Sequence, residues 1–133
     1  MVSQENVELV RAALQAFNRR DGAGFDALLA SEAEIIPVRA AIEDVSYRGA
    51  DAGSQYCVAV DQRWGNLRWE LEEIRDGDDW VLGLGHIRGR GRDSGAVIDA
   101  TGAWVAELQA GQIIRFQTFS DRDAALKAVG LEK

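Results

Sequence analysis

The sequence has little of three residue types on which many functional sites depend. Its 133 residues include one cysteine, Cys57, one histidine, His86, and one proline, Pro37. A lone cysteine cannot form an internal disulfide, and with one histidine it cannot supply the ligands of a zinc site. The sequence therefore predicts no metal and no cofactor. Cys57 itself is expected to be a small buried hydrophobic side chain.

Long apolar runs and an excess of positive charge are also missing. No apolar run approaches the roughly 20 residues of a membrane span, and the first residues lack the basic and then apolar layout of a signal peptide. The net charge is −7, from 15 basic and 22 acidic residues, and this repels polyphosphate at long range. We expect a cytoplasmic protein with neither a membrane nor a nucleic acid as partner.

The residues that are present predict one α+β domain over 1–133. No linker and no repeat divides the chain. Apolar residues recur at helical spacing in the first 18 residues and in 51–64, and a short helix is predicted for 24–30. Residues 32–39 predict a strand that Pro37 ends or places at an edge. Four further strands, 67–75, 80–92, 96–109 and 112–119, precede a last helix with Ser120 or Asp121 as its cap. Helices segregated from a run of strands are typical of the α+β class.

The stretch GLGHIRGRGRDSG, residues 83–95, holds the histidine and three alternating arginines. It lacks the spacing of a dinucleotide-binding loop and runs along a strand instead of turning into a helix. The arginines are expected on one side of a hairpin arm, where acids such as Asp99 can pair with them. Because side chains alternate along a strand, the glycines fall on the face opposite His86. We expect the glycines to face outward and His86 to face into the concave side of the sheet.

Two-residue loops at Asp76-Gly77, Ser94-Gly95 and Ala110-Gly111 would fix the strand register. With those loops, one face of the sheet is apolar at one end and polar at the other, and we expect the helices to cover it. That face carries Leu67, Trp69, Leu71, Leu82, Leu84, His86, Arg88, Asp99, Thr101, Ala103, Val105, Ile114, Phe116 and Thr118. The opposite face carries Trp104, Arg115, Gln117 and Phe119, which predict a homodimer through the outer side of the sheet.

In the order of its segments the chain resembles the nuclear-transport-factor-2-like (NTF2-like) superfamily, in particular its bacterial SnoaL-like, polyketide-cyclase-like branch. The segments that carry the resemblance are ENVELVRAALQAFNRRDGAGFDALLA, YRGADAGSQYCVAV, VLGLGHIRGRGRDSG, LQAGQIIRFQTFSD and AALKAVGL. The resemblance implies a curved, mainly antiparallel sheet that forms a cone, N-terminal helices that close it, and a pocket for small apolar molecules. Many members are homodimers through the outer sheet face.

The catalytic sets of two enzyme types within this superfamily do not match the chain. At the positions that correspond to the base, tyrosine and acid of ketosteroid isomerases stand Pro37, Ala13 and Ala103. At those of the epoxide-hydrolase aspartates and arginine stand Leu84, His86 and Thr118. Fold alone does not assign function, so the remaining polar residues must decide.

Two hypotheses of different classes follow. In the first, the cone binds a small hydrophobic or polyketide-like molecule and converts it by acid/base chemistry, with His86 as proton carrier and Asp99 beside it. The residues expected to line that site are Tyr56, Trp64, Trp69, Leu84, Arg88, Thr101, Val105, Phe116 and Thr118. Glu43 and Asp44 are an alternative source of a base. In the second hypothesis, the protein is a non-catalytic ligand sensor or an interaction dimer, with the pocket filled by core side chains.

Overall fold

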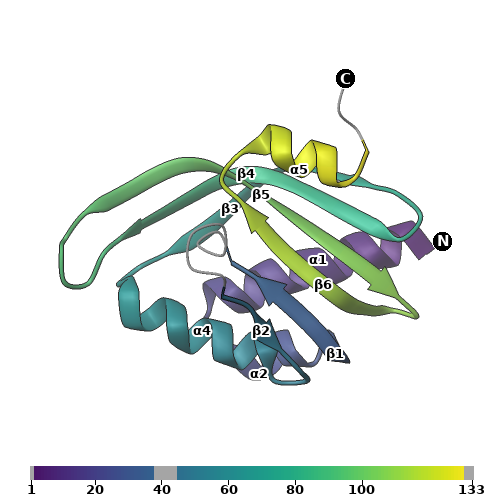
Figure 1. The fold of residues 1–133 in the computed structure, drawn as a ribbon, viewed down its shortest axis with the longest axis horizontal. Helices are drawn as coiled ribbons and strands as arrows, with labels where there is room; N and C mark the ends of the chain where they lie inside the picture. Colours follow the sequence, from purple (N-terminus) through teal and green to yellow (C-terminus); the bar gives the residue numbers. More distant parts are fainter. Residues whose placement is uncertain (1, 38–44, 131–133) are drawn as a thin grey trace.

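A computed structural model describes residues 2–37 and 45–130 of the chain (Figure 1). The helices are α1 (Val2–Asn18), α2 (Gly22–Asp26), α4 (Ala52–Arg63) and α5 (Arg122–Ala128). The strands are β1 (Leu29–Ile36), β2 (Tyr47–Arg48), β3 (Arg68–Asp76), β4 (Trp80–Arg90), β5 (Val97–Gln109) and β6 (Gln112–Phe119). Within these two ranges, no helix is long and apolar enough to cross a membrane.

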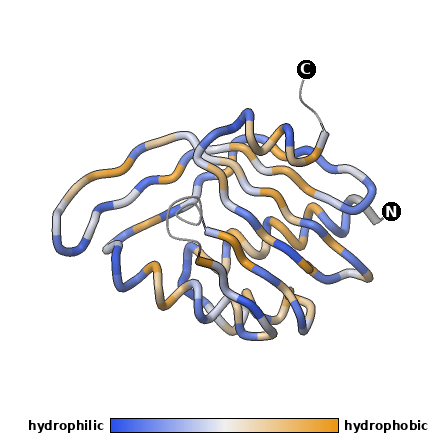
Figure 2. Tube along the Cα trace, in the orientation of Figure 1, coloured by the Kyte–Doolittle hydropathy of each residue, from blue (hydrophilic) through white to orange (hydrophobic). Residues whose placement is uncertain are grey.

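The six strands form one curved, open sheet in the order β2-β1-β6-β5-β4-β3. Only β1 and β6 run parallel, and the other neighbours described here are antiparallel. Helices α1, α2 and α4 lie on one side of the sheet and α5 lies on the other (Figure 1). Hydrophobic and hydrophilic residues alternate along the strands (Figure 2), as expected where the two faces of a sheet differ. The α+β class predicted from the sequence is confirmed.

The main core fills the space between the three N-terminal helices and the concave side of the sheet. Helix α1 contributes residues at helical spacing, and Val10, Ala13 and Phe17 are fully buried. A second, smaller cluster lies on the convex side, where α5 covers β4 and β5. That cluster consists of Leu82, Leu84, Ala103, Val105 and Ala125, with Trp80, Phe119, Leu126 and Val129 at its edge.

Arg20 follows the end of α1 and connects α1, α4 and the residue before β3. Its φ of 55° lies in the left-handed region, which is uncommon for a residue with a side chain. Its guanidinium donates to the Phe17 carbonyl oxygen at 2.7 Å, to the Leu67 carbonyl oxygen at 2.6 Å and to Asp61 Oδ1 at 2.7 Å. It also lies over the Phe17 ring, 4.5 Å from its centroid. These contacts hold α1, α4 and the start of β3 at fixed distances.

Helix α4 begins where the sequence predicted it. The Asp26 carboxylate, at the end of α2, accepts hydrogen bonds from the Ser54 backbone N–H at 2.9 Å and from the Ser54 hydroxyl at 2.5 Å. A carboxylate at a helix N-terminus satisfies amides that have no partner within the helix. At the other end of the chain the predicted cap is confirmed, because the Asp121 carboxylate accepts from the Asp123 N–H.

The strand registers differ from the prediction at two bulges. The turn at Ala110 and Gly111 has two positive φ angles, as its type requires, and is confirmed. However, an irregularity between Glu107 and Leu108 shifts the pairing, so Trp104 lies opposite Thr118. Such a bulge adds one residue on one strand, and every side chain beyond it points to the other face.

The β3–β4 turn lies at Asp78 and Asp79 instead of the predicted Asp76-Gly77, because the Gly77 N–H donates to the Trp80 carbonyl oxygen. Together with a second bulge, between Leu71 and Glu73, this turn places Trp69 opposite Ile87 instead of Leu84. The β4–β5 loop is also longer than predicted, because the ladder ends at Arg90 and Val97. That change shifts the register by two residues and keeps the faces. The bulges, by contrast, reverse the faces. Side chains of β3 and β6 that were predicted to share a face with His86 and Val105 lie on the opposite face of the sheet.

Candidate functional site

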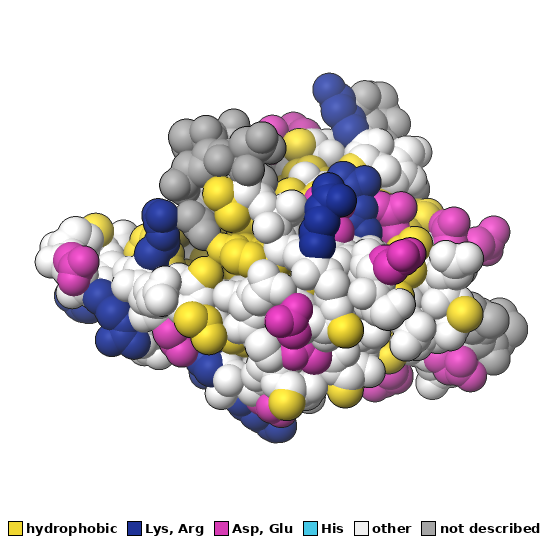
Figure 3. Space-filling model, turned by 60° about the horizontal axis from the view of Figure 1, so that its bottom comes forward, with side chains coloured by type: hydrophobic (Ala, Val, Ile, Leu, Met, Phe, Trp, Pro, Cys, Tyr) yellow, Lys and Arg dark blue, Asp and Glu magenta, His cyan; other side chains and the backbone are white. Residues whose placement is uncertain are grey.

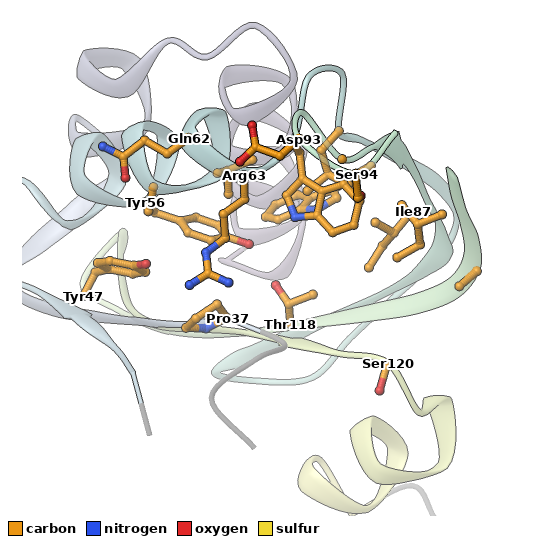
Figure 4. A pocket seen from close by; sticks show the side chains of 18 of the residues that line it. Pro37, Tyr47, Tyr56, Gln62, Arg63, Ile87, Asp93, Ser94, Thr118 and Ser120 are labelled. Carbon is orange, nitrogen blue, oxygen red and sulfur yellow. The ribbon is translucent and has the colours of Figure 1, made fainter. Parts of the chain in front are cut away.

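A cavity of about 450 Å³ lies on the concave side of the sheet, below α4 and beside the arm formed by β4 and β5 (Figure 4). Figure 3 shows hydrophobic side chains grouped near the inner end of the arm on this side of the molecule, with acidic and basic side chains spread around them. The described residues that line the cavity are Pro37, Tyr47, Tyr56, Ala59, Val60, Gln62, Arg63, Trp64, Leu67, Trp69, Ile87, Gly91, Asp93, Ser94, Ile98, Ala100, Thr101, Thr118 and Ser120.

Stacked aromatic rings form one wall of the cavity. Trp69 stacks on Phe17 with centroids 3.8 Å apart and planes within 8°, and Tyr56 lies 5.9 Å from Trp69. The Asn18 side chain fixes the Trp69 backbone through two hydrogen bonds of 2.9 Å, one donated and one accepted. Asn18 thereby makes the two hydrogen bonds that a neighbouring strand would make at this edge of the sheet. The position of Trp69 is therefore fixed before a ligand binds.

Hydroxyl groups lie at the polar end of the cavity. Tyr56, Arg63 and Thr118 point into the same space (Figure 4). Burial raises the pKa of the Tyr56 phenol, and the neighbouring Thr118 hydroxyl only partly offsets this, so the phenol stays protonated and can donate a hydrogen bond. Thr118 is 4% exposed, and its hydroxyl faces the Tyr56 phenol, but no hydrogen bond of ordinary geometry satisfies it among the described residues. Unpaired polar atoms next to a cavity favour a polar ligand atom there.

The arm is attached to the end of α4 and closes one side of the cavity. Trp64 forms a bridge with Gly91, and the Gly65 N–H donates to the Arg90 carbonyl oxygen at 2.7 Å. The Arg92 side chain adds a hydrogen bond to the Asp61 carbonyl oxygen. Residues beyond this attachment, at the tip of the arm, therefore reach the cavity lining.

Comparison with known proteins places the chain in a family. The SnoaL-like domain matches residues 10–116. The chain belongs to the SnoaL-like domain family. Among proteins with curated functions, none matches the sequence.

Solved structures with this SnoaL-like fold share its architecture at low sequence identity. One is an NTF2-like protein of unknown function from Burkholderia pseudomallei K96243, with TM-score 0.77, 20% identity, and coverage of 92% of this chain and 95% of that one. Another is a putative polyketide cyclase from Xanthomonas campestris pv. campestris, with TM-score 0.76, 18% identity, and coverage of 96% and 98%. A third is TerC, co-crystallised with polyporic acid, with TM-score 0.75, 16% identity, and coverage of 95% and 98%. These likenesses confirm the predicted NTF2-like fold.

The predicted lining residues of this SnoaL-like domain divide between the two faces of the sheet. Five of them line the cavity, and Phe116 lies fully buried behind Trp69, with ring centroids 5.7 Å apart. The five are Tyr56, Trp64, Trp69, Thr101 and Thr118. Leu84 and Val105 instead belong to the convex cluster under α5, and Arg88 lies on the same convex side.

His86 and Asp99 also lie outside the cavity, so their predicted position in the cone is wrong. The His86 Nδ1 atom lies 2.9 Å from Glu72 Oε2 on the convex side. Asp99 is the cross-strand partner of Arg88, whose Nε lies 3.5 Å from Asp99 Oδ1. The cause is the two bulges, because the faces of β4 and β5 were assigned from their apparent neighbours on β3 and β6.

The glycines of β4 likewise face inward, contrary to the prediction. A Cβ atom built on Gly85 would lie 1.9 Å from the Glu70 carbonyl oxygen, and one on Gly83 would lie 2.9 Å from Leu71 Cδ1. Close approach of this kind leaves room only for glycine. The bare inner surface of β4 is where Trp104 and the bulged β3 pack.

The face predicted to form a dimer is only partly as expected. Trp104 is fully buried on the concave side, which corrects the prediction. Arg115 and Gln117 pair with Glu107 and Val105 and lie on the convex side as predicted. Phe119 lies there too, packed at the edge of the cluster that α5 covers. The homodimer itself stays a prediction.

Several lining residues were not identified from the sequence. Asp93, Ser94 and Ile98 belong to the arm, and its attachment to α4 has no sequence signature that marks these residues as cavity lining. Tyr47 could have been found, because it follows the irregular segment and is an apolar ring with a polar tip. The alternative bases Glu43 and Asp44 lie outside the described residues.

Cys57 takes the structural role that the sequence predicted. Its side chain is 4% exposed, and burial raises the pKa of the thiol to about 11. A thiol with that pKa is protonated at neutral pH and therefore a poor nucleophile.

Proposed function

We propose that this SnoaL-like protein binds a small, planar, mainly apolar molecule of the polyketide type in the concave cavity. The observation that carries the proposal is the joining of an aromatic wall to a set of hydroxyl groups inside one cavity of about 450 Å³. Sites for small molecules are commonly apolar clefts of roughly 300 to 1,000 Å³ with a few polar groups that orient the ligand.

The geometry of the wall supports a flat ligand. Phe17, Trp69 and Phe116 form a stack with near-parallel planes, at 8° and 11° between successive rings. The cavity side of this stack is continued by Tyr56 and Tyr47, whose centroids are 5.6 Å apart. Phe17 and Phe116 are fully buried, so a planar ring system would lie against Tyr56, Tyr47 and the part of Trp69 that lines the cavity, and would bury its apolar surface there.

Two of the structural relatives support a ligand of this chemical type. One is described as a putative polyketide cyclase, and TerC was crystallised with polyporic acid. Both share the fold of this chain, and the proposal takes from them only the class of molecule.

The proposed function is ligand binding, and His86 and Asp99 have no role in proton transfer in it. A general base must come within hydrogen-bonding reach of the proton that it removes, and both residues lie on the other side of the sheet. Among the described lining residues, only Asp93 carries a carboxylate. An open cavity also distinguishes this proposal from an interaction module whose interior is filled by core side chains.

Two neighbouring residues of α4 provide a test with an internal control. Ala59 lines the cavity, whereas Val58 is 59% exposed and does not. Ala59→Phe should fill the cavity and lower the affinity for planar ligands at least tenfold, and Val58→Phe should leave it unchanged. Binding of polyporic acid and of other aromatic polyketide-like acids would be measured by isothermal titration calorimetry.

The outcome separates cavity binding from surface adsorption. Equal loss of affinity in both variants, or no loss in either, would place the ligand outside the cavity and contradict the proposal. Circular dichroism and thermal unfolding of both variants establish that each remains folded. If no planar ligand binds the wild-type protein, the proposed function itself is wrong.

A further inference from the structure

Two buried polar groups without partners stand side by side on the concave face. Among all described residues, buried side-chain nitrogen or oxygen atoms lack a hydrogen-bonding partner only at Trp104 Nε1, Thr118 Oγ1 and Arg122 Nε. Trp104 and Thr118 are directly opposite each other in the β5–β6 ladder. Directly paired residues of neighbouring antiparallel strands have Cβ atoms roughly 5 Å apart and point to the same face.

This pairing is unusual for a protein interior. Most buried polar groups have a partner, because leaving one unpaired after removing it from water is unfavourable. Trp104 is fully buried and Thr118 is 4% exposed, so bulk water does not solvate them. Thr118 lines the cavity, so a group that enters the cavity can reach its hydroxyl, whereas Trp104 is fully buried and is not among the lining residues.

The chemistry of the groups defines that partner. The indole N–H of Trp104 can only donate, and the Thr118 hydroxyl can donate or accept. The Tyr56 phenol, which stays protonated through burial, points toward Thr118 and adds another donor (Figure 4). None of these three side chains carries a charge, and the Arg63 guanidinium that points into the same space is also only a donor, so the matching group is a hydrogen-bond acceptor.

We propose that Thr118 and Tyr56 form a subsite for a carbonyl oxygen, so the ligand is a planar ketone or quinone whose oxygen points toward the β5–β6 ladder. This inference rests on the proposed function and specifies its ligand. The rings of the ligand lie against the wall at Tyr56 and Trp69, and the oxygen enters the space beside Thr118. A site built to bond a polar atom discriminates strongly against an analogue that lacks it, because its own groups are then left unpaired.

A pair of ligands that differ at one position tests the subsite. Fluoren-9-one and fluorene have the same planar skeleton, and only the first has a carbonyl oxygen. We expect the wild-type protein to bind fluoren-9-one at least tenfold more tightly than fluorene in equilibrium dialysis. Thr118→Val and Tyr56→Phe should each reduce this ratio to below about threefold, mainly by weakening the binding of the ketone.

Thr118→Ser and Gln117→Val serve as controls. Thr118→Ser retains a hydroxyl and should preserve most of the preference for the ketone. Gln117 precedes Thr118 on β6 but lies on the convex side opposite Val105 and does not line the cavity, so its substitution should leave the ratio unchanged. Thr118→Val should also raise the Tm of the unliganded protein, because it removes an unpaired buried hydroxyl while keeping the shape of the side chain.

Each result decides between distinct alternatives. Equal binding of the two ligands by the wild-type protein would overturn the carbonyl subsite and leave the proposed cavity binding intact. A ketone preference that survives Thr118→Val and Tyr56→Phe would overturn the assignment of these residues. A rise in Tm without any effect on the ratio would mean that the hydroxyl is merely unpaired or bridged by water. Failure of both ligands to bind would contradict the proposed function together with the inference.

Discussion

The two faces of β4 meet different surroundings although their residues alternate along one strand. On the convex face, Leu82 and Leu84 lie under α5, and beyond them His86 and Arg88 pair with acids on β3. On the concave face, glycines alternate with apolar residues such as Ile87, and the bulged β3 and the aromatic core approach closely. The convex face is therefore covered in part by α5 and by ion pairs, and the concave face carries the cavity with the aromatic wall.

This difference shows how the same strand can serve stability on one side and ligand binding on the other. The convex charges form exposed pairs, such as His86 with Glu72, which contribute little to folding in water. The concave side depends on close backbone approach and on ring stacking, which tolerate little change in volume. Substitutions on the two faces should therefore differ strongly in their effects.

The largest expected effect comes from Gly85 on the concave face. Gly85→Ala would place a Cβ atom 1.9 Å from the Glu70 backbone oxygen, a neighbour that cannot move without distorting β3. We expect a loss of about 3 kcal/mol in the free energy of unfolding, measured by urea denaturation. A loss below about 0.5 kcal/mol would show that the bulge at Leu71 relaxes freely and that the faces are less different than the structure indicates.

A smaller effect is expected at Asn18, which supports the concave wall from the edge of the sheet. Asn18→Ala removes both hydrogen bonds to the Trp69 backbone and leaves that edge of β3 unpaired. We expect a loss of about 2 kcal/mol in urea denaturation, together with faster amide exchange at Trp69. The neighbouring exposed substitution Arg19→Ala should be close to neutral and provides the control; equal effects would remove Asn18 from its positioning role.

The smallest effect is expected from His86 on the convex face. His86→Gln removes the imidazole from an exposed pair with Glu72, while the Arg122 guanidinium remains 3.4 Å from the same carboxylate. We expect a change of less than about 0.5 kcal/mol in the free energy of unfolding and no change in ligand affinity. A tenfold loss of affinity with unchanged stability would contradict the placement of the site on the concave face.

The sequence was sufficient for most elements of the fold but not for β2, for the end of α2, or for the assignment of faces. Helical spacing and turn residues located α4, α5 and the turn at Ala110, because these depend on local backbone preferences. Trp69 and Thr118 were expected beside His86, and they lie on the other face. The reason is that a bulge needs one extra residue and no special residue type, and here the extra residues are Glu72 on β3 and Ile114 on β6.

The two bulges also explain which of the predicted strand residues line the cavity, apart from Thr101, which lines it although it is paired with His86. Residues on β3 and β6, such as Trp69 and Thr118, were placed facing the helices and do face them. Residues on the central strands, such as His86 and Val105, were assigned to the same face through the register and therefore were placed on the wrong side. The residues that the arm contributes to the cavity lining depend on the bridge between Trp64 and Gly91. This tertiary contact could not be derived from the alternation of residues along the strands.

The guanidinium of Arg20 has a consequence for the spacing of three elements around the binding site. It is a rigid planar group, and it fixes oxygen atoms of Phe17, Asp61 and Leu67 around itself. Those atoms belong to the helix behind the stacked rings, the helix above the cavity and the entry to the strand that carries Trp69. Arg20 thus acts as a spacer between these three elements, and a lysine, which is more flexible and lacks the planar set of donors, would not reproduce the three contacts.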